Sequence, residues 1–402
     1  MSTNLTRVAL AALALVASGC SEEEAAPVPE GLRVGLLLPF TGSASATASN
    51  LERSALFAAD RINAGGGIDG QPLRIISRDT HSDPERGVEA ARELVALGAV
   101  AVIGPESADV AEQVAPVLAE ENVLFLSPFV GAAADPSRTC STPWFRLAPS
   151  AKALGEALAK QAKAANVPEV AVFYSGSPYD RALGAAAASR FPQLGGKVVV
   201  QAELDPDAQS YASEVRRAID AGVTDVILAA SPRAAALVVN EFDALSRTKP
   251  RWFLSPLLKT DLLVQNVAPQ ALDGALGVAP KIDERDGNFP KTFAQRWLGD
   301  EPLEGAYFYY DATALLAIAL AKSAYSDTKP ELNPAMLEAA GPPGEAVRWN
   351  ELDVGLQRLS EGEDMYYTGL TGPLRLERCG GRATGITSTW TVEAGRIVDL
   401  EN

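Results

Sequence analysis

The sequence predicts an α/β protein built from two doubly wound lobes that follow one another along the chain. Two observations lead to this prediction. Short apolar runs that end at glycine, proline or serine alternate with segments of helical periodicity, as is typical of buried parallel strands joined by helices. This alternation also occurs twice. A chain of 402 residues, 47% hydrophobic and 21% charged, is long enough for two or three domains.

One complete unit of this pattern lies in the first third of the chain. Two apolar runs, 100–103 and 123–126, flank a helix whose valines and leucine share one face. Both strands then point the same way, so the loops 104–109 and 127–131 follow their carboxyl ends, where open α/β sheets place ligands. Ser107 in the first loop either caps the helix or offers its hydroxyl to a ligand. Capping is the commoner role of such a serine.

The other predicted elements repeat this unit. Before it, strands are predicted at 33–38 and 73–77, and helices at 55–62 and 84–97. A second series follows it, with strands at 170–174, 197–203, 225–230 and 251–254 and helices at 181–190, 210–221 and 233–246. The rest is interpreted as additions to the two lobes rather than a third domain: an apolar run at 275–279, helices at 289–298 and 310–325, and a β-meander over 369–397.

The N-terminus is expected to be a targeting segment rather than part of the fold. Arg7 precedes the apolar run Val8–Ala17, whose length suits a signal peptide. The residues up to Cys20 resemble the cleavage site of a bacterial lipoprotein, in which the cysteine receives lipid, although Ala17 replaces the usual larger aliphatic residue. We therefore expect a signal over 1–19, a lipidated Cys20 and an acidic tether over 20–30. An ordinary signal peptide with a chance cysteine is the alternative.

The expected export also affects the interpretation of the other two cysteines, because it would place them in an oxidising compartment. Cys140 and Cys379 form an even pair in an oxidising compartment. This favours one disulfide over two free thiols or a metal site.

Charge and motif content argue against nucleic-acid binding and catalysis. The formal net charge of −16 provides no basic surface for a phosphate backbone. His81 is the only histidine and lies in a polar loop, so neither a Ser-His-Asp arrangement nor a multi-histidine metal site is expected. The glycines of GGGIDG at 65–70 close a helix instead of opening one, so they predict a turn rather than a dinucleotide site. No catalytic residue, metal or cofactor is expected.

The order of several motifs resembles the type I periplasmic binding proteins of the leucine/isoleucine/valine-binding family, the extracytoplasmic receptors of ABC importers for amino acids, amides and urea. The motifs include VGLLLPFTG at 34–42, AADRINAGGGIDGQPL at 58–73, SDPERGVEAARELV at 82–95, IGPESADVAEQVAPV, LSPF, WFRLAPS at 144–150, YYDATALLAIAL at 309–320 and YTGLTGPLRL at 367–376. The resemblance covers nearly the whole mature chain.

This resemblance implies two lobes joined by three hinge segments, near 147–151, 278–281 and 367–372. The first lobe would contain 31–148 plus 280–367, and the second 149–279 plus 368–402. The implied function is a monomeric, lipid-anchored protein outside the cytoplasm that captures a small polar ligand between its lobes and delivers it to an ABC permease. The alternatives are a ligand sensor without a transport role and an α/β enzyme.

The resemblance also implies a ligand site made of Ser107, Ala108, Ser127, Phe129, Val130, Gly131, Tyr179 and Ser231. Two positions differ from relatives that bind amino acids. Gly131 replaces a threonine that holds the ligand carboxylate, and Pro256 stands where an acid usually takes the ligand ammonium. With Lys259 nearby, we expect a ligand without a free ammonium, unless Asp180, Asp205 or Asp261 supplies the missing charge.

Overall fold

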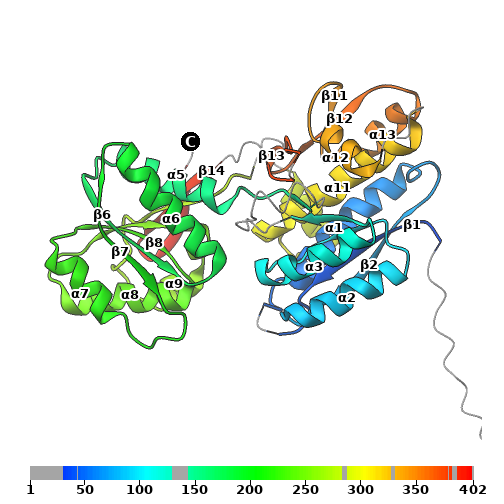
Figure 1. Ribbon diagram of the computed structural model, residues 1–402. Helices are drawn as coiled ribbons and strands as arrows, with labels where there is room; N and C mark the ends of the chain where they lie inside the picture. Colours follow the sequence, from blue (N-terminus) through cyan, green and yellow to red (C-terminus); the bar gives the residue numbers. More distant parts are fainter. Residues whose placement is uncertain are drawn as a thin grey trace, which may run out of the picture.

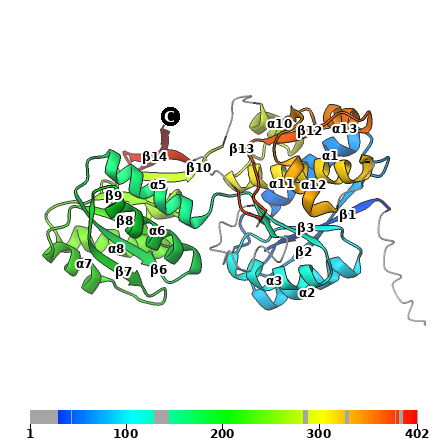
Figure 2. The ribbon, with the colours of Figure 1, turned by 45° about the horizontal axis from the view of Figure 1, so that its top comes forward.

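The computed structural model describes residues 30–42, 44–128, 144–282, 288–326, 331–378, 380–382 and 387–400. Figure 1 shows two bodies side by side, one mostly green and the other blue, cyan, yellow and orange, with extended segments passing between them. Each body contains a twisted sheet with helices on both faces (Figure 2). The predicted α/β class with two doubly wound lobes is confirmed.

The first lobe is organised on a five-stranded parallel sheet of order β2-β1-β3-β4-β5. Its strands are β1 (Leu32–Leu38), β2 (Leu73–Asp79), β3 (Ala101–Ile103), β4 (Leu124–Ser127) and β5 (Trp144–Arg146). Alternate residues of β1 face opposite sides: Leu36 and Leu38 pack with α1 (Ala48–Ala64) and α11 (Glu304–Tyr325), while Leu37 packs with α2 (Pro84–Ala96) and α3 (Ala108–Glu120). Helix α11 therefore belongs to this lobe although it lies far along the chain.

The second lobe contains a seven-stranded sheet of order β15-β14-β10-β9-β8-β6-β7. Its strands are β6 (Glu169–Ser175), β7 (Lys197–Leu204), β8 (Asp225–Ala229), β9 (Arg251–Leu254), β10 (Leu276–Pro280), β14 (Thr387–Glu393) and β15 (Arg396–Leu400). Helices α5 (Ala151–Ala164) and α6 (Pro178–Gln193) cover one face, and α7 (Ala212–Asp220) and α8 (Pro232–Leu245) cover the other. The short helices η1 (Pro256–Leu258) and α9 (Asp261–Gln265) follow β9.

Smaller elements complete the first lobe. They are α10 (Phe289–Arg296), α12 (Leu332–Ala339), α13 (Leu352–Ser360) and a small sheet of β11 (Glu345–Val347), β12 (Met365–Gly369) and β13 (Gly372–Pro373). The buried Asp311 carboxylate in α11 fixes the β12–β13 turn by accepting hydrogen bonds from Tyr367, Leu370 and Thr371 at 2.7–2.9 Å. This turn lies in the segment near 367–372 that the family resemblance implied as the third hinge, and it packs on the first lobe.

The sequence predictions differ from the structure at several elements. The predicted β-meander over 369–397 is wrong: β12–β13 and β14–β15 are two hairpins in different sheets, and β14 pairs antiparallel with β10. Helix α11 begins at Glu304, before the predicted start at 310. Helices α5, α12 and α13 were not predicted. The turn after α1 is confirmed, with Gly66 and Gly67 at positive φ.

Several predictions concern residues that the structure does not describe. The signal peptide, Cys20 and the tether up to residue 29 lie outside the described residues, as do Cys140, Cys379 and the proposed disulfide. Within the described part of the chain, none of the helices combines the length and apolar character needed to cross a bilayer.

Candidate ligand-binding cleft

A cavity of about 620 Å³ lies between the two lobes, and we refer to it as the cleft. Its lining comes from loops and first helical turns at the carboxyl ends of strands in both sheets, together with the first residue of α11. The described lining residues are Ala44, Ala46, Thr47, Glu106, Ser107, Ala108, Ala148, Pro149, Leu154, Tyr179, Ser231, Pro232, Pro256, Leu257, Thr260, Pro280 and Glu304. Open α/β sheets bind small molecules outside the carboxyl ends of their strands, and here these ends of both sheets border the same cavity.

Ser107 lines the cleft with a hydroxyl that is not used for capping. The residue occupies the N-cap position of α3 with extended backbone angles, yet its side chain makes no capping hydrogen bond. Ser231 differs, because its hydroxyl accepts a hydrogen bond from Ala234 N at 3.3 Å while it lines the cleft. Of the two serines, Ser107 therefore has the freer hydroxyl for a ligand, contrary to the expectation that it caps the helix.

Tyr179 enters the cleft from the first turn of α6. Burial raises the pKa of its phenol above the ordinary value, and the nearby charges of Asp180 and Glu304 raise it further. The Asp180 carboxylate is itself buried and accepts hydrogen bonds from Ser175 Oγ at 2.5 Å and Ser177 Oγ at 2.9 Å. It serves the turn before α6, and neither it nor Asp205 nor Asp261 is among the described lining residues.

The remaining predicted site residues occupy different surroundings. Ala108 lines the cleft. Ser127 is fully buried, and its Oγ accepts a hydrogen bond from Trp144 Nε1 at 2.8 Å, so its hydroxyl serves the contact between β4 and β5. Phe129, Val130 and Gly131 lie outside the described residues. The structure thus brings Ser107, Ala108, Tyr179 and Ser231 together in one cavity.

Two carboxylates that were not predicted also line the cleft. Glu106 accepts a hydrogen bond from Thr47 Oγ1 at 2.9 Å, and burial raises the pKa of its carboxyl above the ordinary value. Glu304 is the first residue of α11. Burial raises its pKa to about 6, with Lys259 opposing the shift and Asp399 adding to it.

These two acids line the same cavity from different elements, Glu106 from the loop before α3 and Glu304 from the start of α11. A Cβ atom built on Gly305, the neighbour of Glu304, would lie 4.0 Å from Glu106 Oε1. At that distance an added side chain would clear Glu106, and the packing that excludes a Cβ is against Leu51, whose Cδ2 atom would lie 2.8 Å away. Glu106 stands next to Ser107 in the motif already recognised, so its position could have been noticed. Glu304 gave no such signal, because only the tertiary fold brings the start of α11 to the cleft.

Glu106 and Glu304 change the expectation that the cleft lacks an acid for a ligand ammonium. Pro256 does line the cleft, as predicted, but Glu106 and Glu304 supply negative charge from other elements. Lys259 forms an ion pair with Asp399 at 2.7 Å and is not among the described lining residues. A ligand without an ammonium is therefore no longer favoured by the charges of the site.

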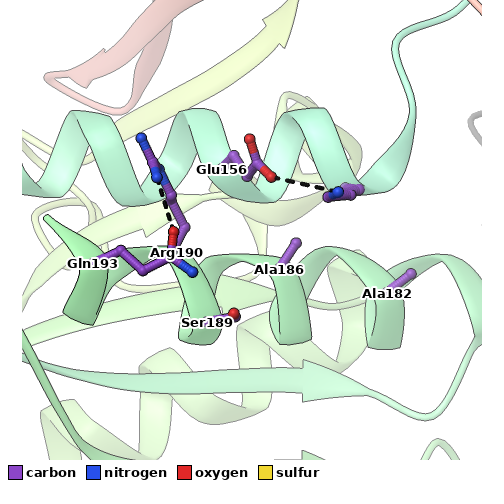
Figure 3. Close-up of a pocket in the computed structure, with 7 residues that line it drawn as sticks. Glu156, Ala182, Ala186, Ser189, Arg190 and Gln193 are labelled. Atoms are coloured by element: carbon purple, nitrogen blue, oxygen red, sulfur yellow. Dashed lines mark hydrogen bonds and ion pairs between the residues drawn. The ribbon is translucent and has the colours of Figure 1, made fainter.

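A second hollow, on the surface of the second lobe between α5 and α6, differs from the cleft (Figure 3). Its polar side chains pair among themselves: Lys152 lies 4.0 Å from Glu156, and Arg190 donates to Gln193 at 2.8 Å. All of its described lining comes from two neighbouring helices of one lobe. It lacks the two-sided construction of the cleft.

Comparison with known proteins agrees with this construction. A 26% identical relative is Leu/Ile/Val-binding protein homolog 1 of Brucella abortus, matched over 318 residues that cover 76% of this chain and 82% of the relative. Over a shorter stretch of 97 residues, 24% of this chain and 26% of the relative, the chain is 37% identical to Leu/Ile/Val-binding protein BraC3 of Rhizobium johnstonii.

Solved structures with the same fold cover almost the whole chain. A leucine binding protein, LivK, from Thermotoga maritima superposes with a TM-score of 0.73 at 17% identity, covering 92% of this chain and 98% of that protein. A solute binding protein from R. palustris in complex with benzoate gives 0.69 at 19% identity, covering 92% and 95%. The family model described as "Periplasmic binding protein" matches residues 31–393. The chain therefore belongs to the periplasmic binding protein family.

Proposed function

We propose that this protein is a solute-binding lipoprotein outside the cytoplasm, which captures a small ligand in the cleft and delivers it to an ABC importer. The observation that carries the proposal is the cavity of about 620 Å³ with walls from both lobes. A volume of this size suits a small molecule. Because each lobe supplies part of the wall, a ligand that contacts both walls favours the closed arrangement of the lobes.

In this proposal the ligand contacts Ser107 and Tyr179 from opposite lobes. Ser107 and Ala108 offer a hydroxyl and the N-terminus of α3, while Tyr179 offers an aromatic face and a hydroxyl. Ser231 contributes to the wall of the second lobe, and contacts from Ser127, Phe129, Val130 and Gly131 remain part of the proposal on the strength of the family resemblance. The hydroxyl of Ser127 already serves Trp144. Any contact from Ser127 is therefore assigned to its backbone.

Ligand binding is tested by a thermal-shift screen of amino acids, amides, organic acids and amines, followed by calorimetry on the hits. A binder raises the melting temperature without being consumed. Tyr179→Ala is expected to weaken binding of a hit at least tenfold, since it removes one wall of the cleft. Ser189→Ala in the surface hollow is the control and should bind as the parent does. Turnover of a hit, or binding that is insensitive to Tyr179→Ala, would contradict the proposal.

Membrane attachment through Cys20 and a monomeric state are parts of the same proposal. Lipoproteins carry more than one acyl chain, which is enough for stable anchoring. Cys20→Ala should move the protein from the membrane fraction to the soluble fraction, and the released protein should elute as a monomer. A variant that stays in the membrane fraction would disprove the lipid anchor.

The proposed Cys140–Cys379 disulfide has a separate test. A bridge that closes so long a loop is expected to stabilise the fold by about 2–5 kcal/mol. Thiol titration of the denatured, unreduced protein should find neither cysteine reactive. Two reactive thiols at these positions would rule out the bridge.

A further inference from the structure

We propose that the ligand of the cleft carries net positive charge, as an amine or amidine with an apolar body, and that Glu106 and Glu304 bind its cationic group beside the Tyr179 ring. This inference rests on the proposed solute-binding function and specifies the class of solute. It assigns the ammonium site to the first lobe instead of the second-lobe position that Pro256 occupies.

The first argument is the charge of the cleft. Among its described lining residues, Glu106 and Glu304 are charged and no lysine or arginine is present. Lys259 lowers the pKa of Glu304 through its charge, but it forms an ion pair with Asp399. A zwitterion would leave the carboxylate charges uncompensated when the lobes close around it. A cation compensates at least one of them.

The second argument is the bonding capacity left on the two acids. Glu106 accepts one hydrogen bond, from Thr47, at 2.9 Å. The Glu304 carboxylate has neither a hydrogen bond nor an ion pair within the residues that the structure describes. Each carboxylate can accept about four hydrogen bonds, and an ammonium supplies three donors. The unused acceptors therefore match a primary amine placed between the two side chains.

The third argument is the cost of burying Glu106 and Glu304. Each of the two carboxylates is penalised by desolvation, because burial disfavours its charged form. The Tyr309 hydroxyl is fully buried without a hydrogen-bond partner in the described structure, and the charge of Glu106 adds to the increase in its pKa. Nothing described in the chain neutralises Glu106. A cationic ligand does so and offsets the cost of burying the charge.

The walls indicate the rest of the ligand. Alanine, proline and leucine dominate the described lining, so the body of the ligand is expected to be apolar. Tyr179 is the aromatic residue of that lining, and its ring lies near enough to Glu304 for the carboxylate to influence its pKa. A cation held by Glu304 is therefore also well placed for an attractive interaction with the tyrosine ring.

The cleft should bind such a ligand more tightly as pH rises. Glu304 has a pKa of about 6, so it is mostly protonated at pH 5 and ionised at pH 7.5. The charged groups that act on it are Lys259, which favours ionisation, and Asp399, which disfavours it, while Tyr179 stays neutral in this range. Thr47 and Tyr309 are the neighbours of Glu106.

A series of five-carbon compounds tests the charge preference at constant size: pentylamine, 1,5-diaminopentane, norvaline, pentanamide and pentanoate. Calorimetry of the purified protein at pH 7.5 should show the two amines binding at least tenfold more tightly than pentanamide or pentanoate. Glu106→Gln and Glu304→Gln should each weaken amine binding at least tenfold. Glu301→Gln, an exposed acid just before α11, should not change it.

The pH profile separates a direct role of Glu304 from a structural one. Affinity for pentylamine should fall about tenfold between pH 7.5 and pH 5 in the parent protein, and this dependence should become weaker in Glu304→Gln. Preference for pentanoate or pentanamide, unaffected by either glutamine variant, would overturn the cation assignment and leave the solute-binding proposal standing. If none of these compounds and none of the wider screen binds, both proposals fall.

Discussion

At the residue scale, Glu304 combines a functional position with a cost to stability. Its pKa is raised from 4.5 to about 6, so between these values the folded chain retains a proton that the unfolded chain has lost. The free energy of unfolding therefore falls as pH rises through this interval. A carboxylate that weakens its own fold is a common feature of binding sites, where stability is sacrificed for ligand contacts.

Glu304→Gln should consequently stabilise the ligand-free protein at pH 7.5 by roughly 1 kcal/mol, after allowance for the partial exposure of the side chain. At pH 4, where the parent carboxyl is mostly protonated in both states, the difference in stability should become small. Urea unfolding at both pH values measures the difference. Glu301→Gln provides the reference, with no change expected at either pH, and a less stable Glu304→Gln at pH 7.5 would contradict the argument.

The sequence predicted the local part of the site and missed the part that depends on tertiary structure. Ser107 and Tyr179 were predicted because each follows a strand end or opens a helix within a recognisable motif. Glu304 was not, because its neighbours in space, Glu106 and Tyr179, are far from it along the chain. Helical periodicity shows which face of α11 is buried, but not that its N-terminus reaches a cleft. The charge of the site therefore required the structure.

At the element scale too, the sequence predicted what depends on local signals and missed what depends on tertiary structure. Strands β1 to β4 and β6 to β10 were predicted closely, because continuous apolar runs ending at Gly, Pro or Ser are strong local signals. Helix α5 was missed since its buried face consists largely of alanine and glycine, which give weak periodicity. The partners of β14 and β15 were also missed, because pairing with β10 is set by the lobe as a whole.

The connection between β3 and α3 depends on Gly104, and its substitution tests how the loop carrying Glu106 and Ser107 is positioned. Gly104 has φ +97°, and an added Cβ would lie 2.1 Å from the Leu37 carbonyl oxygen. Gly104→Ala should lower the free energy of unfolding by about 3 kcal/mol or more and weaken ligand binding. Gly222→Ala, at φ +74° in open space, should cost only about 1 kcal/mol. Equal effects in urea unfolding would show that the close approach is unimportant.

The attachment of the β12–β13 hairpin to α11 depends on Asp311. Its carboxylate accepts four hydrogen bonds at 2.7–2.9 Å and is fully buried. Asp311→Asn places an amide NH₂ against the Thr371 backbone N–H or the Leu370 N–H, so we expect a loss of about 2–4 kcal/mol. Asp60→Asn, which breaks an exposed ion pair with Arg296, should cost less than about 1 kcal/mol. A small effect of Asp311→Asn in urea unfolding would mean that the turn re-forms with other partners.

At the scale of the whole molecule, Arg382 joins segments that lead from one lobe to the other. Its guanidinium donates to Leu147 O at 3.1 Å, Thr371 O at 2.5 Å and Pro373 O at 2.9 Å. Leu147 precedes the passage to α5, and Pro373 precedes the passage to β14. One side chain therefore holds two connecting segments in a fixed relation.

Arg382→Lys should weaken this link, because one ammonium cannot reproduce the planar fork of a guanidinium. We expect the free energy of unfolding to fall by about 2 kcal/mol and the lobes to vary more in their separation. Small-angle scattering should show a larger radius of gyration without ligand. Arg86→Lys, on the surface of α2, is the control. An unchanged radius together with unchanged stability would show that the segments are held without Arg382.

The strand order has a consequence for the making of this protein. The first sheet is complete at residue 146, but α11, which covers one of its faces, begins only at Glu304. The second sheet receives β14 and β15 from the final residues of the chain. During synthesis from the N-terminus neither lobe can complete its fold early, because each lobe includes a segment from late in the chain. Both lobes are therefore completed only once residues 304–325 and 387–400 are available.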